Sequence, residues 1–113
     1  MDLQLAGMSA LVTGASRGIG LAIARALANE GCHLHLAARS AADLDRARAV
    51  ILDCAGVTVT CHALDLSRAD GVSELARECG TVDILVNNAG AIPTGRLLRV
   101  DSARWREAWD LKV

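Results

Sequence analysis

The chain has 113 residues, of which 52% are hydrophobic, 12 are Lys or Arg and 13 are Asp or Glu, giving a formal net charge of -1. This length fits one small domain with ample apolar content for a core, and the balanced charge, without a basic cluster, argues against nucleic acid and membrane partners. Four scattered cysteines, with neither a C-x-x-C pair nor a secretory leader, indicate reduced thiols and a cytoplasmic location.

Strands and helices alternate along the chain, which is typical of a parallel sheet with helical crossovers. The apolar run at residues 8–12 predicts a strand over residues 9–13, and the apolar face of residues 18–30 predicts a helix. A second strand is expected over residues 32–38. Ser40 is then a suitable N-cap for a helix that reaches Cys54.

The alternation continues in the second half of the chain. Residues 57–64 predict a third strand, and Ser67 is expected to cap a helix that ends at Gly80. Residues 82–86, apolar apart from Asp83, predict a short fourth strand of the kind that is covered on both faces. Residues 101–113 predict a last helix. No linker or internal repeat separates these elements, so we expect one domain.

A glycine-rich turn joins the first strand to the first helix, where residues 13–20 read T-G-A-S-R-G-I-G. In such a turn, glycines let the backbone approach a pyrophosphate, and the helix N-terminus supplies N–H donors and a positive dipole end. We expect Gly14, Gly18 and Gly20 to divide three tasks, which are the tight turn, room for the pyrophosphate, and close helix–strand packing. A plain β-α turn is the alternative, because glycine is common in turns.

A second motif, N-N-A-G at residues 87–90, directly follows the fourth predicted strand. With the glycine-rich turn, it makes nearly the whole chain resemble the classical short-chain dehydrogenase/reductase family. The resemblance implies an α/β fold with a Rossmann-like doubly wound parallel sheet. Residues 1–113 would be the N-terminal dinucleotide-binding part of that single domain, and so a truncated set of β-α units.

The resemblance also implies an activity. The parent protein would be an oxidoreductase that transfers a hydride between NADP(H) and the carbonyl or secondary alcohol of a small molecule, and a homo-oligomer when full length. The alternative is a non-catalytic NADP-binding or regulatory module.

The choice between NADP and NAD is expected at the end of the second strand, beside the adenosine ribose. A carboxylate there would bind the ribose hydroxyls and repel a 2′-phosphate, whereas Arg attracts the phosphate. This strand ends in Arg39 and Ser40 without an acid, and Arg17 in the glycine turn would add a second guanidinium. In the resembled family, Arg at these two places goes with NADP, which is therefore favoured over NAD. Solvated loop arginines are the alternative.

The resemblance implies further cofactor contacts after the third and fourth strands. Asp65, beside Leu66, matches the family's acidic residue next to the adenine, although the bare sequence equally allows a cap two residues before Ser67. Asn88 is expected to touch the cofactor directly, and Asn87 to serve the structure. The expected cofactor-binding residues are Gly14, Ser16, Arg17, Gly18, Ile19, Gly20, Arg39, Ser40, Asp65, Leu66, Asn88, Ala89 and Gly90.

The family's catalytic Ser, Tyr and Lys would lie beyond Val113, and the sequence contains no Tyr. The 113-residue chain alone is therefore expected to be inactive. The family also carries an Asn seven positions after a Trp in the last helix, and counting from Trp105 reaches Lys112. As a candidate catalytic residue, Lys112 would lower the pKa of a neighbouring hydroxyl or bind an acidic substrate. A solvated helix Lys is the alternative.

His33 and His35 share one face of the second predicted strand, a spacing that can bind zinc. No third ligand is evident, because His62 belongs to another strand. The sequence therefore predicts no metal site.

Overall fold

The computed structural model describes residues 4–88. Strands and helices alternate in it, as the sequence predicts. The elements are β1 (Ser9–Thr13), α1 (Gly18–Asn29), β2 (His33–Ala38), α2 (Ala41–Leu52), β3 (Val59–Ala63), α3 (Ala69–Cys79) and β4 (Ile84–Val86). The last predicted helix, at residues 101–113, lies outside the described residues.

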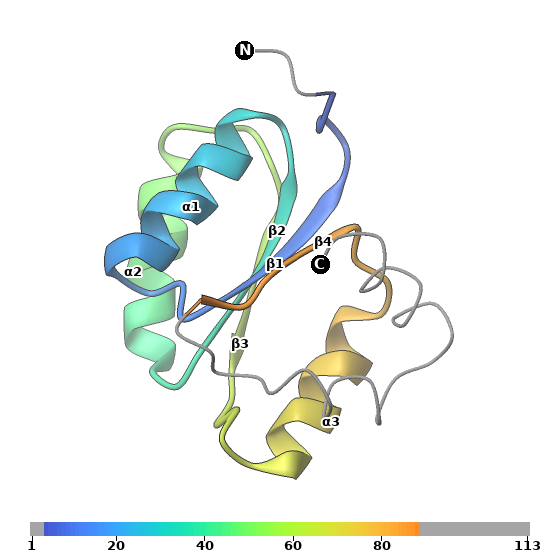
Figure 1. Ribbon diagram of the computed structural model, residues 1–113. Helices are drawn as coiled ribbons and strands as arrows, with labels where there is room; N and C mark the ends of the chain where they lie inside the picture. Colours follow the sequence, from blue (N-terminus) through green and yellow to red (C-terminus); the bar gives the residue numbers. More distant parts are fainter. Residues whose placement is uncertain (1–3, 89–113) are drawn as a thin grey trace.

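The four strands form one parallel sheet in the order β3-β2-β1-β4. β1 is paired with β2 on one side, where Ser9 is opposite His33, and with β4 on the other, where Ala10 is opposite Ile84. The chain therefore builds outward from β1 to β3 and then crosses to the far side of β1 (Figure 1). This reversal is the switch point of a doubly wound, Rossmann-like fold, where ligands bind at the carboxyl ends of the strands.

Helices cover both faces of the sheet, with α1 and α2 on one side and α3 on the other (Figure 1). Strand side chains alternate between the faces, so Ala10 and Val12 pack in the α1–α2 layer while Leu11 packs with α3. All three are fully buried. Double coverage explains why the central residues of β1 and all of β4 are apolar on both faces rather than alternating with polar residues.

The starts of the helices confirm one predicted cap and correct another. Ser40 accepts a hydrogen bond from the backbone N–H of Asp43 at 3.2 Å, as expected of an N-cap. The prediction that Ser67 caps the third helix is wrong, because α3 has Arg68 at its N-cap position, without a side-chain cap. The Ser67 hydroxyl instead donates to Asp65 Oδ1 at 2.6 Å.

Three strands are shorter than predicted, and the one expected at 32–38 lacks only its first residue. The strand expected at 57–64 covers only Val59–Ala63, and the one expected at 82–86 covers only Ile84–Val86. Val82 is nevertheless buried, since it packs against α3 ahead of β4. The apolar residues therefore indicate which positions are buried, but the hydrogen-bonded strand covers fewer residues than the apolar segment.

Ser40→Ala is expected to lower the free energy of unfolding by about 1 kcal/mol, because it removes the acceptor for one unpaired N–H of α2. Ser40→Asp, which keeps a capping oxygen, is the matched variant and is expected to retain most of the stability. Urea denaturation of the two cofactor-free variants measures the difference. Equal midpoints for both would show that the cap contributes nothing.

Candidate cofactor site

The carboxyl ends of β1, β2 and β3 open onto a cavity of about 460 Å³. Its residues come from the turn after β1, the β2–α2 connection and first turn of α2, and the segment after β3. They are Gly14, Ser16, Arg17, Ala37, Ala38, Arg39, Ser40, Asp43, Leu64, Asp65, Leu66 and Ser67. Seven of the residues predicted to bind a cofactor are thus brought to one place, namely Gly14, Ser16, Arg17, Arg39, Ser40, Asp65 and Leu66.

The glycine turn has the geometry that the sequence predicts. Gly14 and Gly18 both have φ of +61°, in the left-handed region that favours glycine. Gly20 does not line the cavity; a Cβ there would lie 2.1 Å from the carbonyl oxygen of Gly14. Gly20 therefore permits close packing of α1 against the turn, as expected. Ile19 is outside the cavity lining and is 74% exposed.

Asn88 holds the glycine turn against the end of β4. Its Nδ2 donates to the carbonyl oxygen of Gly14 at 3.3 Å. The buried hydroxyl of Thr13 lies within 3.4 Å of three acceptors, which are Val86 O, Asn87 Oδ1 and Asn88 O. Asn88 is not among the cavity-lining residues, so its direct contact with a cofactor stays a prediction. The sequence analysis did not identify Thr13 as part of this brace.

Asp43 also lines the cavity, and the sequence analysis missed it. Its Oδ2 accepts from Arg17 Nη2 at 3.2 Å, and its Oδ1 pairs with Arg46. The strand end itself carries no acid, as the sequence analysis says, but the first turn of α2 brings the carboxylate of Asp43 to the same cavity. Two guanidinium groups share this carboxylate and compensate its charge. The sequence could have shown this, because Asp43 lies three residues after the predicted cap Ser40 and so in the first turn of the helix.

Asp65 forms the local turn with Ser67 that the bare sequence allowed, and it also lies at the cavity. It lines the cavity, and its Oδ1 also accepts from the backbone N–H and the hydroxyl of Ser67, at 3.0 and 2.6 Å. These hydrogen bonds hold the pKa of the Asp65 carboxyl below its ordinary value. The close approach of α3 involves Gly71, whose Cβ would lie 2.1 Å from the Asp65 carbonyl oxygen. Contact of Asp65 with an adenine stays a prediction.

Ser67→Ala is expected to raise the pKa of Asp65 toward its ordinary value of 3.8, because the variant removes the hydroxyl donor. The carboxylate of Asp65 stabilises the fold above the unfolded-state pKa, and this stabilisation is lost as the pH falls through the lower folded-state pKa. Carboxyl chemical shifts followed by NMR through an acid titration measure both midpoints. The same midpoint with and without the Ser67 hydroxyl would contradict the assignment.

Three predicted site residues, Ala89, Gly90 and Lys112, lie outside the described residues, and their roles stay predictions. Among residues 4–88, no helix is long and apolar enough to cross a membrane.

The strand order, the glycine turn and the cavity at the strand ends define a Rossmann-like α/β domain. The family model described as short chain dehydrogenase matches residues 8–113. The chain belongs to the short-chain dehydrogenase family.

Several similar curated proteins are named as reductases, and one is named as a dehydrogenase. The chain is 39% identical over 111 residues to L-xylulose reductase from Bos taurus, covering 98% of this chain and 42% of the relative. It is 40% identical over 111 residues to 3-oxoacyl-[acyl-carrier-protein] reductase from Staphylococcus epidermidis, covering 93% and 45%. The chain therefore spans less than half the length of these relatives.

A solved structure of L-sorbose reductase from Gluconobacter frateurii, complexed with NADPH and L-sorbose, has a similar fold. The TM-score is 0.81 at 34% sequence identity, with 95% of this chain and 51% of that chain covered. The resemblance to short-chain dehydrogenases expected from the two motifs is thus confirmed for fold and family.

Proposed function

We propose that the protein is an NADP-dependent oxidoreductase that interconverts a carbonyl and a secondary alcohol of a small molecule. The main observation behind this proposal is the cavity at the strand ends, which is lined by the glycine turn, two arginines and Asp65. The NADPH-complexed L-sorbose reductase supports the same cofactor, and the names of the relatives support reduction as the reaction. When bound, the cofactor supplies the hydride.

The glycine turn fits a dinucleotide pyrophosphate. Gly14 lines the cavity with backbone alone, and Arg17, at the N-cap of α1, makes no side-chain cap hydrogen bond. The first turn of α1 also has no acidic residue. Backbone N–H groups at this helix end are thus available to an anion, which the helix dipole also favours.

The two cavity arginines fit a 2′-phosphate. Among the described residues, no carboxylate forms an ion pair with Arg39, and the side chain of Arg17 is 83% exposed even though it contacts Asp43. A 2′-phosphate would offer Arg39 a charge-assisted partner and would compete with Asp43 for Arg17. Asp43 is shared with Arg46, so it keeps a cationic partner when Arg17 turns to the phosphate.

The intact protein is expected to bind NADPH at least about 10-fold more tightly than NADH, since hydrogen bonds between charged groups contribute about 1.5–3 kcal/mol. Fluorescence titration with each cofactor gives the two dissociation constants. Oxidation of NADPH with a panel of aldehydes and ketones then tests for catalysis. Equal dissociation constants would overturn the NADP assignment, and NADPH binding without any turnover would favour a non-catalytic module.

Three further predictions belong to the intact protein: the catalytic role of Lys112, homo-oligomerisation and a cytoplasmic location. If a Lys112→Ala variant kept the full turnover number, the catalytic role of Lys112 would be disproved and the alternative of a solvated helix Lys would hold.

A further inference from the structure

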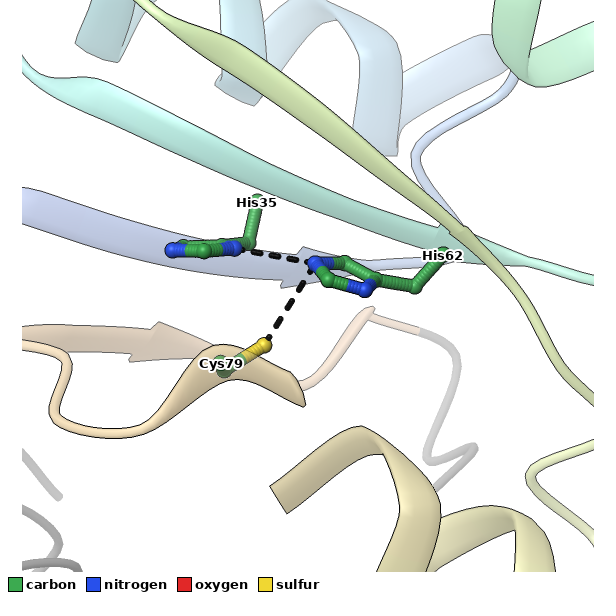
Figure 2. Close-up of side chains that lie close together, drawn as sticks. All are labelled: His35, His62 and Cys79. Carbon is green, nitrogen blue, oxygen red and sulfur yellow. Dashed lines mark hydrogen bonds between the residues drawn. The ribbon is translucent and has the colours of Figure 1, made fainter. Parts of the chain in front are cut away.

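Side chains from three elements converge on the sheet face that α3 covers (Figure 2). His35 comes from β2, His62 from β3 and Cys79 from the last turn of α3. His62 Nε2 lies 2.9 Å from His35 Nδ1 and 3.7 Å from Cys79 Sγ. One ligand atom from each of the three residues lies within 4.8 Å of the other two. His62 and Cys79 are buried, while His35 is half-buried.

The sheet register brings the two histidines together. β2 and β3 are parallel, with His35 opposite Thr60 and Ala37 opposite His62, so the histidines are diagonal neighbours on one face. Their rings stack with centroids 5.1 Å apart. His33 has another partner, since its Nδ1 accepts from the backbone N–H of Thr58 at 3.1 Å. The sequence analysis considered His33 with His35, set His62 aside because it lies on another strand, and did not consider Cys79.

Glu78 orients the central histidine of this cluster. Its Oε1 lies 2.6 Å from His62 Nδ1, an arrangement in which Nδ1 carries a proton and donates it to the carboxylate. His62 Nε2 then presents its lone pair to His35 and Cys79. A carboxylate on the far nitrogen of a metal-binding histidine is a common arrangement, which fixes the tautomer and raises the basicity of the ligand.

We propose that His35 Nδ1, His62 Nε2 and Cys79 Sγ bind one zinc-class divalent cation, with water in the fourth position. Two imidazoles and a thiolate suit zinc rather than magnesium or calcium, which prefer oxygen ligands. Tetrahedral zinc would place its nitrogen ligands about 3.3 Å apart and nitrogen and sulfur about 3.6 Å apart. The distances of 2.9 and 3.7 Å in the cluster are close to these.

Metal binding releases one proton and changes one histidine tautomer. The Cys79 thiol loses its proton to solvent and forms the sulfur–metal bond. His35 moves its proton from Nδ1 to Nε2, which frees the Nδ1 lone pair, and His62 keeps its proton on Nδ1 toward Glu78. The cation would join α3 to β2 and β3 on the face opposite α1 and α2.

The test is a Co²⁺ titration of the intact, tag-free protein after dialysis against a chelator. We expect one equivalent to produce a thiolate-to-cobalt charge-transfer band and the visible bands of four-coordinate cobalt, both removed by excess Zn²⁺. Cys79→Ser is expected to lose the charge-transfer band, and His62→Gln to lose tight binding.

Matched variants serve as controls. Cys61→Ser changes a thiol that faces the carbonyl of Leu44 on the opposite side of β3, and His33→Gln changes the histidine outside the cluster. Both are expected to keep the band and the stoichiometry. Glu78→Ala is expected to weaken Co²⁺ binding about 10- to 100-fold by removing the partner of His62.

A wild-type protein that shows no charge-transfer band with Co²⁺ would overturn the metal site, whether or not any variant folds. A band that persists in Cys79→Ser would overturn the ligand set, and unchanged affinity in Glu78→Ala would overturn the positioning role of Glu78. Circular dichroism of each variant establishes that loss of binding is not loss of fold. Neither NADPH nor turnover enters the measurement, so its result is independent of the proposed oxidoreductase function.

Discussion

Gly20→Ala is expected to lower the free energy of unfolding by about 2–3 kcal/mol, toward the upper end of overpacking effects. The new Cβ would lie 2.1 Å from the Gly14 carbonyl oxygen and 2.8 Å from Asn88 Nδ2. The nearest contact is with backbone, so α1 must move away from the turn. We expect NADPH affinity to fall as well, because the same movement displaces the helix N-terminus. Urea denaturation and cofactor titration measure the two effects.

Gly56→Ala is the matched control for this prediction. A Cβ at Gly56 would have no neighbouring atom within 4 Å, and we expect its stability change to stay within about 0.5 kcal/mol. If Gly20→Ala unfolded at the same urea concentration as Gly56→Ala, the tight contact between α1 and the turn would be disproved.

Arg39→Asp is expected to reverse the cofactor preference. The substitution replaces the guanidinium at the end of β2 by a carboxylate that repels a 2′-phosphate and accepts hydrogen bonds from ribose hydroxyls. Loss of a charge-assisted hydrogen bond alone corresponds to about 10- to 100-fold weaker NADPH binding, and repulsion adds to it. NADH affinity should rise. The ratio of the two dissociation constants, measured at one salt concentration, gives the change in preference.

Arg25→Asp separates this local effect from the change in net charge. Arg25 lies on an exposed position of α1 outside the cavity lining, so the same charge change there should leave the preference for NADPH intact. An equal loss of NADPH affinity in both variants would mean that long-range attraction, rather than a contact from Arg39, selects the cofactor.

Local patterns predicted the elements well because their causes lie within a few neighbouring residues. The strand at Ser9–Thr13 has its predicted bounds, as an apolar run that ends where Gly14 turns the chain. The cap at Ser40 is confirmed for the same reason. The cap at Ser67 is wrong because Asp65, two residues earlier, takes the Ser67 hydroxyl and backbone N–H for its own turn.

Features that depend on strand register or on side-chain conformation could not be predicted from one sequence. Arg17 meets Asp43 because α1 and α2 begin at the same edge of the sheet. His35 meets His62 through the parallel register of β2 and β3. In each pair, the residues are far apart in the chain, and no local sequence pattern determines the register of the strands that brings them together.

The pairing of β1 with β4 joins segments that are far apart in the chain, and this separation bears on the order of folding. Thr13 and Gly14 form hydrogen bonds with residues more than 70 positions later in the chain. At the other end of the β1–β4 strand pair, the Asp83 carboxylate accepts a hydrogen bond from the backbone N–H of Ser9. During synthesis, β1 therefore leaves the ribosome early but waits for its second neighbour until β2, β3 and α3 have been made. Contacts of such sequence separation form late and slow the folding of a chain. The contacts between the glycine turn and the end of β4 thus form only when β4 docks.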